Sequence, residues 1–220
     1  MRKSLTLIFL TCLIYTYAIG TDYFFRATED HLYENPANWI PAYPGTEIAK
    51  GDRVVLLDDV NFVGFDIQVN GKLEIGMGVS VISGENGFVV NENGTIDNWG
   101  EILVSHIENY GKVYNCIAAR IYLKTFRAFR GAFTYNAHSS LFATISDLEN
   151  QGRFDNYGEC KTGNDFLNHA IFYQVRYANL DVRGNMILAP GSVFTHSPQS
   201  TVVAGKPKKP LFQERLWDKF

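Results

Sequence analysis

The sequence predicts an all-β protein, a single-stranded, right-handed parallel β-helix or solenoid with an N-terminal cap. Two observations predict it: apolar and polar residues alternate with a period of two, and Asn recurs with Gly at successive turns. A hydrophobic content of 46% and a charged content of 20% are those of a chain that folds. Disordered and collagen-like chains are therefore excluded.

The alternation is clearest between Ile67 and Val81. The odd positions carry Ile, Val, Gly, Leu, Ile, Met, Val and Val, whereas the even positions carry polar residues or Gly. Such alternation indicates pleated strands with one buried face and one wet face. The stretch is longer than an ordinary strand, so its glycines are expected to mark bends that keep the apolar side inward.

The turn at Asn70-Gly71 distinguishes a solenoid from a meander. Asn-Gly is usually a strong signal for a two-residue hairpin, but that hairpin would place Val69 opposite Lys72, an apolar residue against a polar one. A corner that lets the chain continue around a common interior keeps Val69 and Leu73 on the same side. A three-residue loop centred on Gly71 would do so too, although Gly is expected at the last position of such a loop. The sequence favours the corner.

Asn and Gly recur as a loosely spaced motif. Both residues adopt tight corner conformations at low cost, and stacked Asn side chains can hydrogen-bond between successive turns. Parallel sheets covered by helices are apolar on both faces, whereas in this chain one face stays polar, as expected of a solenoid with solvent outside. The copies are Asn70-Gly71, Asn86-Gly87, Asn93-Gly94, Asn98-Trp99-Gly100, Asn109-Tyr110-Gly111, Asn150-Gln151-Gly152 and Asn156-Tyr157-Gly158.

Residues 1–20 have the features of a secretory signal peptide. Arg2 and Lys3 precede an apolar stretch that is short for a bilayer span, and Ala18 and Gly20 supply small residues at a cleavage site before Thr21. An uncleaved membrane anchor is the alternative. The sequence predicts no transmembrane segment after the signal is removed, and a secreted or cell-surface location.

Three further segments complete the expected organisation. The solenoid domain is expected over residues 21–204, and its turn-rich, aromatic residues 21–52 are expected to cap the first open coil. Residues 116–145 are apolar without clear alternation, so a helical or wide-loop insertion is expected there. Residues 205–220 combine Lys and Pro with apolar residues, which predicts a linker ending in a short docking segment or a fraying tail.

Charge and cysteine content limit the function classes. With 20 basic and 23 acidic residues the net charge is −3, which argues against nucleic-acid binding. Cys116 and Cys160 remain after signal removal. An oxidising compartment would permit a disulfide between them, and each could equally be a small buried hydrophobe.

Two runs of residues carry a family resemblance. They are Glu34-Asn35-Pro36-Ala37-Asn38-Trp39-Ile40-Pro41-Ala42-Tyr43-Pro44-Gly45, followed by Ile48, and Gly51-Asp52-Arg53-Val54-Val55-Leu56. This segment is similar to the opening of repeat-rich, adhesin-like surface proteins secreted by Bacteroidetes-type bacteria, and the similarity covers residues 34–115. The resemblance implies a parallel β-solenoid and an exported binding or scaffold role, and it implies no catalytic residue. Members often carry a C-terminal secretion-sorting domain, of which this sequence shows no obvious counterpart.

Five residues are candidates for ligand binding. Trp99, Tyr110 and Tyr157 accompany corner glycines, and exposed rings there could stack on sugars along one face of a solenoid. Stacking of these rings on one another between coils is the alternative. Arg120 and Arg127 lie in a basic stretch interleaved with aromatic residues, which could hold an anionic glycan or could be the wet side of a structural segment.

The sequence predicts no catalytic residue, metal ligand or cofactor. The histidines are dispersed and no HExxH or nucleophile-elbow motif is present. Asp58-Asp59 could bind Ca²⁺ only in a turn, because adjacent carboxylates on a strand point to opposite faces.

The function expected from the sequence is therefore an exported, non-catalytic module that binds or scaffolds extracellular polysaccharide or surface proteins. Its oligomeric state is left open by the sequence. A polysaccharide lyase or hydrolase, with carboxylates and Arg120 in a groove, is the alternative.

Overall fold

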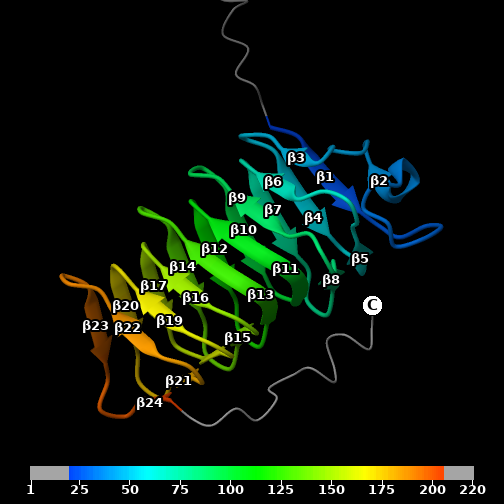
Figure 1. The fold of residues 1–220 in the computed structure, drawn as a ribbon. Helices are drawn as coiled ribbons and strands as arrows, with labels where there is room; N and C mark the ends of the chain where they lie inside the picture. The colour runs from blue at the N-terminus through cyan, green and yellow to red at the C-terminus, as the bar shows by residue number, and fades with distance from the viewer. Residues whose placement is uncertain (1–19, 206–220) are drawn as a thin grey trace, which may run out of the picture.

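The chain winds into stacked coils that form a β-solenoid, as the sequence predicts (Figure 1). The computed structural model describes residues 20–205. The expected signal peptide, apart from Gly20, and the expected tail beyond Gly205 lie outside the described residues. Each coil lies against the next through parallel strand pairing, so the coils share one apolar interior.

The first side of every coil belongs to a 10-stranded sheet, which we call sheet A. All of its neighbouring strands are parallel except the first pair, in which Phe24 and Phe25 oppose Ile40 and Trp39 in antiparallel register. In spatial order the strands are β2 (Trp39–Ile40), β1 (Asp22–Phe25), β4 (Arg53–Leu56), β7 (Lys72–Ile75), β10 (Thr95–Asn98), β12 (Lys112–Asn115), β14 (Phe133–Asn136), β17 (Arg153–Asn156), β20 (Ile171–Gln174) and β23 (Val193–His196).

The rest of every coil belongs to a 14-stranded sheet, sheet B, which bends along its length. Its two long strands run through the bend, so their two halves pair with different short strands, and each coil has three sides. The strands are β3 (Glu47–Ile48), β5 (Val60–Asn61), β6 (Ile67–Val69), β8 (Ser80–Ile82), β9 (Phe88–Val90), β11 (Glu101–Asn109), β13 (Arg120–Ala128), β15 (Leu141–Thr144), β16 (Leu148–Asn150), β18 (Glu159–Thr162), β19 (Phe166–Asn168), β21 (Asn179–Val182), β22 (Met186–Leu188) and β24 (Thr201–Ala204).

The predicted corner at Asn70-Gly71 is confirmed. Val69 ends β6 and Leu73 lies in β7, both side chains are fully buried, and both strands pair in parallel with the coils on either side. Gly71 is required because a Cβ there would lie 2.3 Å from the carbonyl oxygens of Ala49 and Asp52. The inward face predicted between Ile67 and Val81 is also confirmed, with one exception: Met77 points outward at a corner.

Buried amide side chains form a ladder along the interior, which confirms the predicted Asn stacking. In each step one Nδ2 donates to the side-chain oxygen of the next coil, at 2.9, 2.8, 2.7 and 2.8 Å in order. Each of these amides also donates to a backbone carbonyl, so the ladder gives a hydrogen-bond partner to buried polar groups at the corners. Its members are Asn98, Asn115, Asn136, Asn156 and Gln174.

The Asn-x-Gly copies of the motif share one local structure. The Oδ1 of Asn98 accepts the N–H of Gly100 at 3.1 Å, and Asn156 does the same for Gly158 at 3.2 Å. The glycine is needed because a Cβ on Gly158 would lie 2.3 Å from a carbonyl oxygen of the preceding coil. The Asn-Gly copies differ: the Asn70 side chain donates outward to Glu47.

The expectation of an insertion within residues 116–145 is wrong. This segment contains β13, β14 and β15 and continues the coils without interruption. The alternation is hidden because β13 bends: Leu123 and Phe126 are both buried, which shifts the inward parity by one at Lys124-Thr125. Phe129 and Phe133 lie on the outer side and add apolar residues where polar ones are expected.

Residues 21–52 differ from the later coils. After β1 the chain forms a short 3₁₀ helix, Pro36–Asn38, and the antiparallel strand β2. Tyr33 and Trp39 are buried beside Phe25, with ring centroids 4.9 Å apart between Tyr33 and Trp39. The capping role of this segment stays a prediction.

Candidate ligand-binding groove

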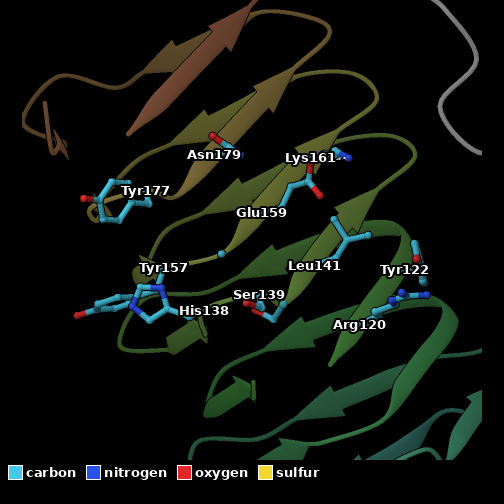
Figure 2. Close-up of a pocket in the computed structure, with 12 residues that line it drawn as sticks. Arg120, Tyr122, His138, Ser139, Leu141, Tyr157, Glu159, Lys161, Tyr177 and Asn179 are labelled. Carbon is cyan, nitrogen blue, oxygen red and sulfur yellow. Dashed lines mark ion pairs between the residues drawn. The ribbon is translucent and has the colours of Figure 1, made fainter. Parts of the chain in front are cut away.

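A groove follows the corner at which each coil passes from sheet A to sheet B. It consists of two hollows that share Arg120, a smaller one of about 590 Å³ around Trp99 and a larger one of about 640 Å³ around Tyr157. We call the two together the corner groove. Figure 2 shows the larger hollow, with aromatic side chains from the turns on one side and strand side chains on the other.

The hollows arise because the corner turns differ in length. Two residues, Trp99 and Gly100, connect β10 to β11, and two, Tyr157 and Gly158, connect β17 to β18. On the coils before and after each tight turn, four residues make the same connection, for example residues 116–119 between β12 and β13. A tight turn between two longer turns is recessed, so Trp99 and Tyr157 each lie at the floor of a hollow.

The longer turns carry an unusual backbone conformation. Among the described residues, the non-glycine residues with positive φ are Ala118 (63°), Ser139 (60°) and Tyr177 (65°). They occupy the same place in three corner turns, and all three line the groove. Such residues cost on the order of 1 kcal/mol each and concentrate at functional sites.

Side chains of the turns make an exposed apolar wall. Met77 is 85% exposed, Tyr177 is 70% exposed and Trp99, although at the floor, is 45% exposed. His138 lies edge-on to Tyr157 with ring centroids 5.4 Å apart, as Figure 2 shows. Exposed apolar side chains gathered along one line are a feature of binding sites rather than of an inert surface.

The opposite wall comes from the outer face of sheet B. Arg120, Leu141 and Glu159 occupy the same register position on successive coils, and Asn179 follows on the next. Lys161 pairs with Glu159 at 2.6 Å, which Figure 2 marks with a dashed line. The groove therefore offers apolar rings on one side and hydrogen-bonding groups of both charges on the other.

Aromatic side chains continue from the groove onto the outer face of sheet A. Tyr135 lies 5.2 Å from Tyr157, and Tyr114 lies 6.3 Å from Tyr135, between ring centroids. Burial raises the pKa of the Tyr135 hydroxyl. The guanidinium of Arg153 lies 5.2 Å from the ring centroid of Tyr173 on the same face.

The structure brings three of the five predicted binding residues together. Trp99, Tyr157 and Arg120 line the corner groove. Tyr110 lies at the corner between sheet B and sheet A, stacked on Phe129 with centroids 4.0 Å apart. Arg127 lies on the outer face of β13, where its Nε donates to Glu149 at 2.8 Å.

Several groove residues were missed by sequence reasoning. His138 and Tyr177 stand in four-residue turns without Asn-x-Gly, and Glu159 and Lys161 stand in an ordinary alternating strand. The sequence contains one signal for the longer turns, the two glycines of Gly76-Met77-Gly78. Gly78 stands at the position equivalent to Ala118, and both residues have a positive φ, which glycine adopts readily.

The disulfide considered between Cys116 and Cys160 is absent, and both are free cysteines. Cys116 follows β12 and Cys160 lies in β18, two coils further on. Two coils separate backbones by about 9–10 Å along the axis, more than the roughly 7 Å that a disulfide spans between Cα atoms. Cys160 is instead a buried hydrophobe within the core.

Neither a metal centre nor a membrane helix is found within residues 20–205. No group of three or more His, Cys, Asp or Glu side chains is placed to hold a metal ion there. Asp58 accepts the N–H of Ala27 and Asp59 that of Ser80, so the two carboxylates engage different coils. No helix in this part of the chain is long and apolar enough to cross a bilayer.

Comparisons with known proteins give no assignment. The chain matches no protein family model, and no curated protein or solved structure shows significant similarity to it.

Proposed function

We propose that this protein is an exported, non-catalytic β-solenoid that binds extracellular polysaccharide along the corner groove. The observation that carries the proposal is the repetition of one construction: an aromatic side chain on a tight turn, between two longer turns, occurs at Trp99 and again at Tyr157. Two similar hollows in one line suit a ligand that is itself a repeating polymer.

The spacing of the hollows supports an extended ligand. Trp99 and Tyr157 are three coils apart, and coils repeat every 4.8 Å or so, which separates the two floors by about 14 Å. Each hollow has a volume within the roughly 300–1,000 Å³ usual for small-molecule sites. Sugar units have apolar C–H faces and hydroxyl edges, which match a ring on one wall and Arg120 with Asn179 on the other.

The arrangement of acidic groups supports binding over hydrolysis. Glu101 and Glu159 line the two hollows at the same register position, three coils apart, so their backbones are about 14 Å apart. Glycoside hydrolases place their two carboxyl groups about 5–9.5 Å apart. Glu159 is also engaged by Lys161.

A glycan array with the purified protein and three matched variants tests the proposal. We expect Trp99→Ala and Tyr157→Ala each to weaken binding to the same glycans. Tyr110→Ala is the control, because Tyr110 has the same Asn-aromatic-Gly motif but lies at a different corner. Circular dichroism checks that each variant is folded.

Three results would overturn the proposal. The first is that no glycan binds, and the second is that Tyr110→Ala weakens binding as much as Trp99→Ala does. The third is the release of reducing or unsaturated ends from a bound glycan, which would make the protein an enzyme.

Export is tested separately. The signal features of residues 1–20 predict that the protein recovered from outside the cells begins at Thr21. Intact-mass measurement reads this start directly, and a full-length mass of a cell-associated protein would contradict it.

A further inference from the structure

The two hollows of the corner groove differ in their lining. The Tyr157 hollow is lined mainly by hydrogen-bonding side chains, among them Tyr122, Glu159 and Asn179. The Trp99 hollow is lined by apolar side chains from the turns and by three polar side chains from sheet B. A ligand unit that fits the Trp99 hollow therefore needs an apolar group as well as hydrogen-bonding groups.

The apolar wall of the Trp99 hollow comes from three successive corner turns. Met77, Trp99 and Ile117 lie on the turns that follow β7, β10 and β12. Met77 is 85% exposed and Ile117 is 65% exposed, on the coils before and after that of the indole. Stacking of a sugar ring uses the flat face of the indole. It leaves the two aliphatic side chains unexplained, and exposed apolar groups gathered at one place are typical of a site that buries an apolar group.

The polar wall of the same hollow carries a donor and an acceptor side by side. Ser80, Glu101 and Arg120 occupy the same register position on three successive coils, and all three line the hollow. A guanidinium only donates hydrogen bonds, whereas a carboxylate only accepts them. Neighbouring strands are about 4.8 Å apart, so Glu101 and Arg120 present the two functions at close range. A ligand group that accepts at one point and donates at a nearby point is complementary to this pair.

An acetamido group combines these three features. Its methyl group is apolar, its carbonyl oxygen accepts a hydrogen bond and its N–H donates one. In the hollow, the methyl group fits the wall of Met77 and Ile117, the carbonyl oxygen fits Arg120, and the N–H fits Glu101. A hydroxyl group at the same position of a sugar lacks the methyl group and leaves the aliphatic wall exposed. A free amino group lacks both the methyl group and the acceptor for Arg120.

We propose that the Trp99 hollow binds an N-acetylated amino sugar, and that the polysaccharide ligand contains this unit. The inference rests on the proposed function, because it names the class of sugar that the corner groove takes. Trp99 holds the sugar ring, and Met77 with Ile117 contacts the methyl group. Glu101 and Arg120 bind the amide. The larger hollow, three coils away, takes a unit that presents hydroxyl groups.

The hexasaccharides of chitin, chitosan and cellulose test the proposal. They share one backbone and differ in a single substituent, which is acetamido, amino or hydroxyl. Isothermal titration calorimetry with the whole purified protein measures the dissociation constant of each. We expect the chitin hexasaccharide to bind on the order of tenfold more tightly than the cellulose hexasaccharide, because burial of one methyl group contributes about fourfold and a hydrogen bond a similar factor.

Substitutions of Met77 separate the methyl contact from the rest of the groove. Met77→Ser should weaken binding of the chitin hexasaccharide about fourfold and leave binding of the cellulose hexasaccharide unchanged, because the methyl group is the part of the ligand that this side chain contacts. Met77→Leu keeps an apolar side chain and should retain the parent's affinity. Val63→Ser is the matched control, since Val63 is 68% exposed and does not line either hollow.

Several results would overturn the inference and leave the proposed function standing. They are equal binding of the chitin and cellulose hexasaccharides, tighter binding of the chitosan hexasaccharide, and array glycans that bind while the chitin hexasaccharide does not. An equal loss for both ligands in Met77→Ser would count against it in the same way. So would an oligomer, measured by light scattering, that Met77→Ser dissociates, because a second copy would then cover the apolar wall. If no glycan of the array binds, the proposed function fails and the inference fails with it.

Discussion

Replacing Asn136 with Ala tests the amide ladder at its centre. Asn136 is fully buried, and its side chain makes four hydrogen bonds. It accepts from Asn115 at 2.8 Å and from Ser140 at 2.7 Å, and it donates to Asn156 at 2.7 Å and to the carbonyl oxygen of Glu159 at 3.0 Å. Alanine removes all four.

The expected loss of unfolding free energy follows from these contacts. Each hydrogen bond contributes about 1 kcal/mol net, so the four together contribute about 4 kcal/mol. Asn115 keeps its bond to the carbonyl oxygen of Leu141, and Asn156 still accepts from Gly158, which limits the cost to the bonds themselves. A loss of this size is a large part of the roughly 5–15 kcal/mol typical of a whole domain.

Urea titration of Asn136→Ala and of a control variant measures the loss. Asn93→Ala is the control, because Asn93 is an exposed asparagine that takes no part in the ladder, and its replacement is expected to change stability by less than about 0.5 kcal/mol. Coincident transitions by circular dichroism and tryptophan fluorescence are required before a free energy is assigned, since repeat proteins can unfold in parts. A loss below about 1 kcal/mol, or one equal to the control, would refute the ladder's stabilising role.

Three further predictions concern pH, thiol reactivity and close packing. The Arg53 guanidinium holds the pKa of Glu74 below its usual value of 4.5, so the pair stabilises the fold above that pH and the stabilisation is lost as the pH falls through the lowered pKa. Glu74→Gln should therefore be less stable than the parent by about 1 kcal/mol at neutral pH, and this difference in unfolding free energy should close on acidification. A difference that widens at low pH would contradict this. Burial raises the pKa of Cys116 to about 11, so its labelling by a disulfide reagent should be slow at pH 8 and accelerate with rising pH. Cys160 is fully buried and should react only on unfolding. Equal rates for the two thiols would argue against the complete burial of Cys160 in the core. Gly158→Ala should lower the unfolding free energy by about 3 kcal/mol in urea titration, because the added Cβ meets a carbonyl oxygen at 2.3 Å; an unchanged midpoint would show that the corner can relax.

The solenoid could be predicted from the sequence because its inward face repeats every second residue. Alternation and the Asn-Gly corners are local properties of the sequence, and they can be recognised without knowing which coil lies beside which. Membership of the ladder could not be predicted in the same way. Its steps span 17, 21, 20 and 18 residues, so no single period marks it, and Asn115, Asn136 and Gln174 carry no glycine two residues later.

The groove could be predicted only in part for a related reason. Trp99, Tyr110 and Tyr157 stand in the same Asn-aromatic-Gly motif, yet only the first and third lie where the chain passes from sheet A to sheet B, whereas Tyr110 lies where it returns from sheet B to sheet A. Tyr110 is covered because Phe129, nineteen positions further along, falls directly over it. The identity of the corner and the length of the turns on neighbouring coils both depend on register, which local sequence does not contain.

The motif at the two hollows links the fold to the proposed function. In Asn98-Trp99-Gly100 the amide enters the buried ladder, the glycine lets the preceding coil approach, and the indole is left at the floor of the groove. Neighbouring residues thus serve opposite sides of one corner. Trp99 can be replaced without disturbing the ladder, whereas loss of Asn98 removes the support beneath the groove as well as stability. Trp99→Ala is therefore expected to weaken binding without lowering the unfolding free energy. Asn98→Ala is expected to lower both.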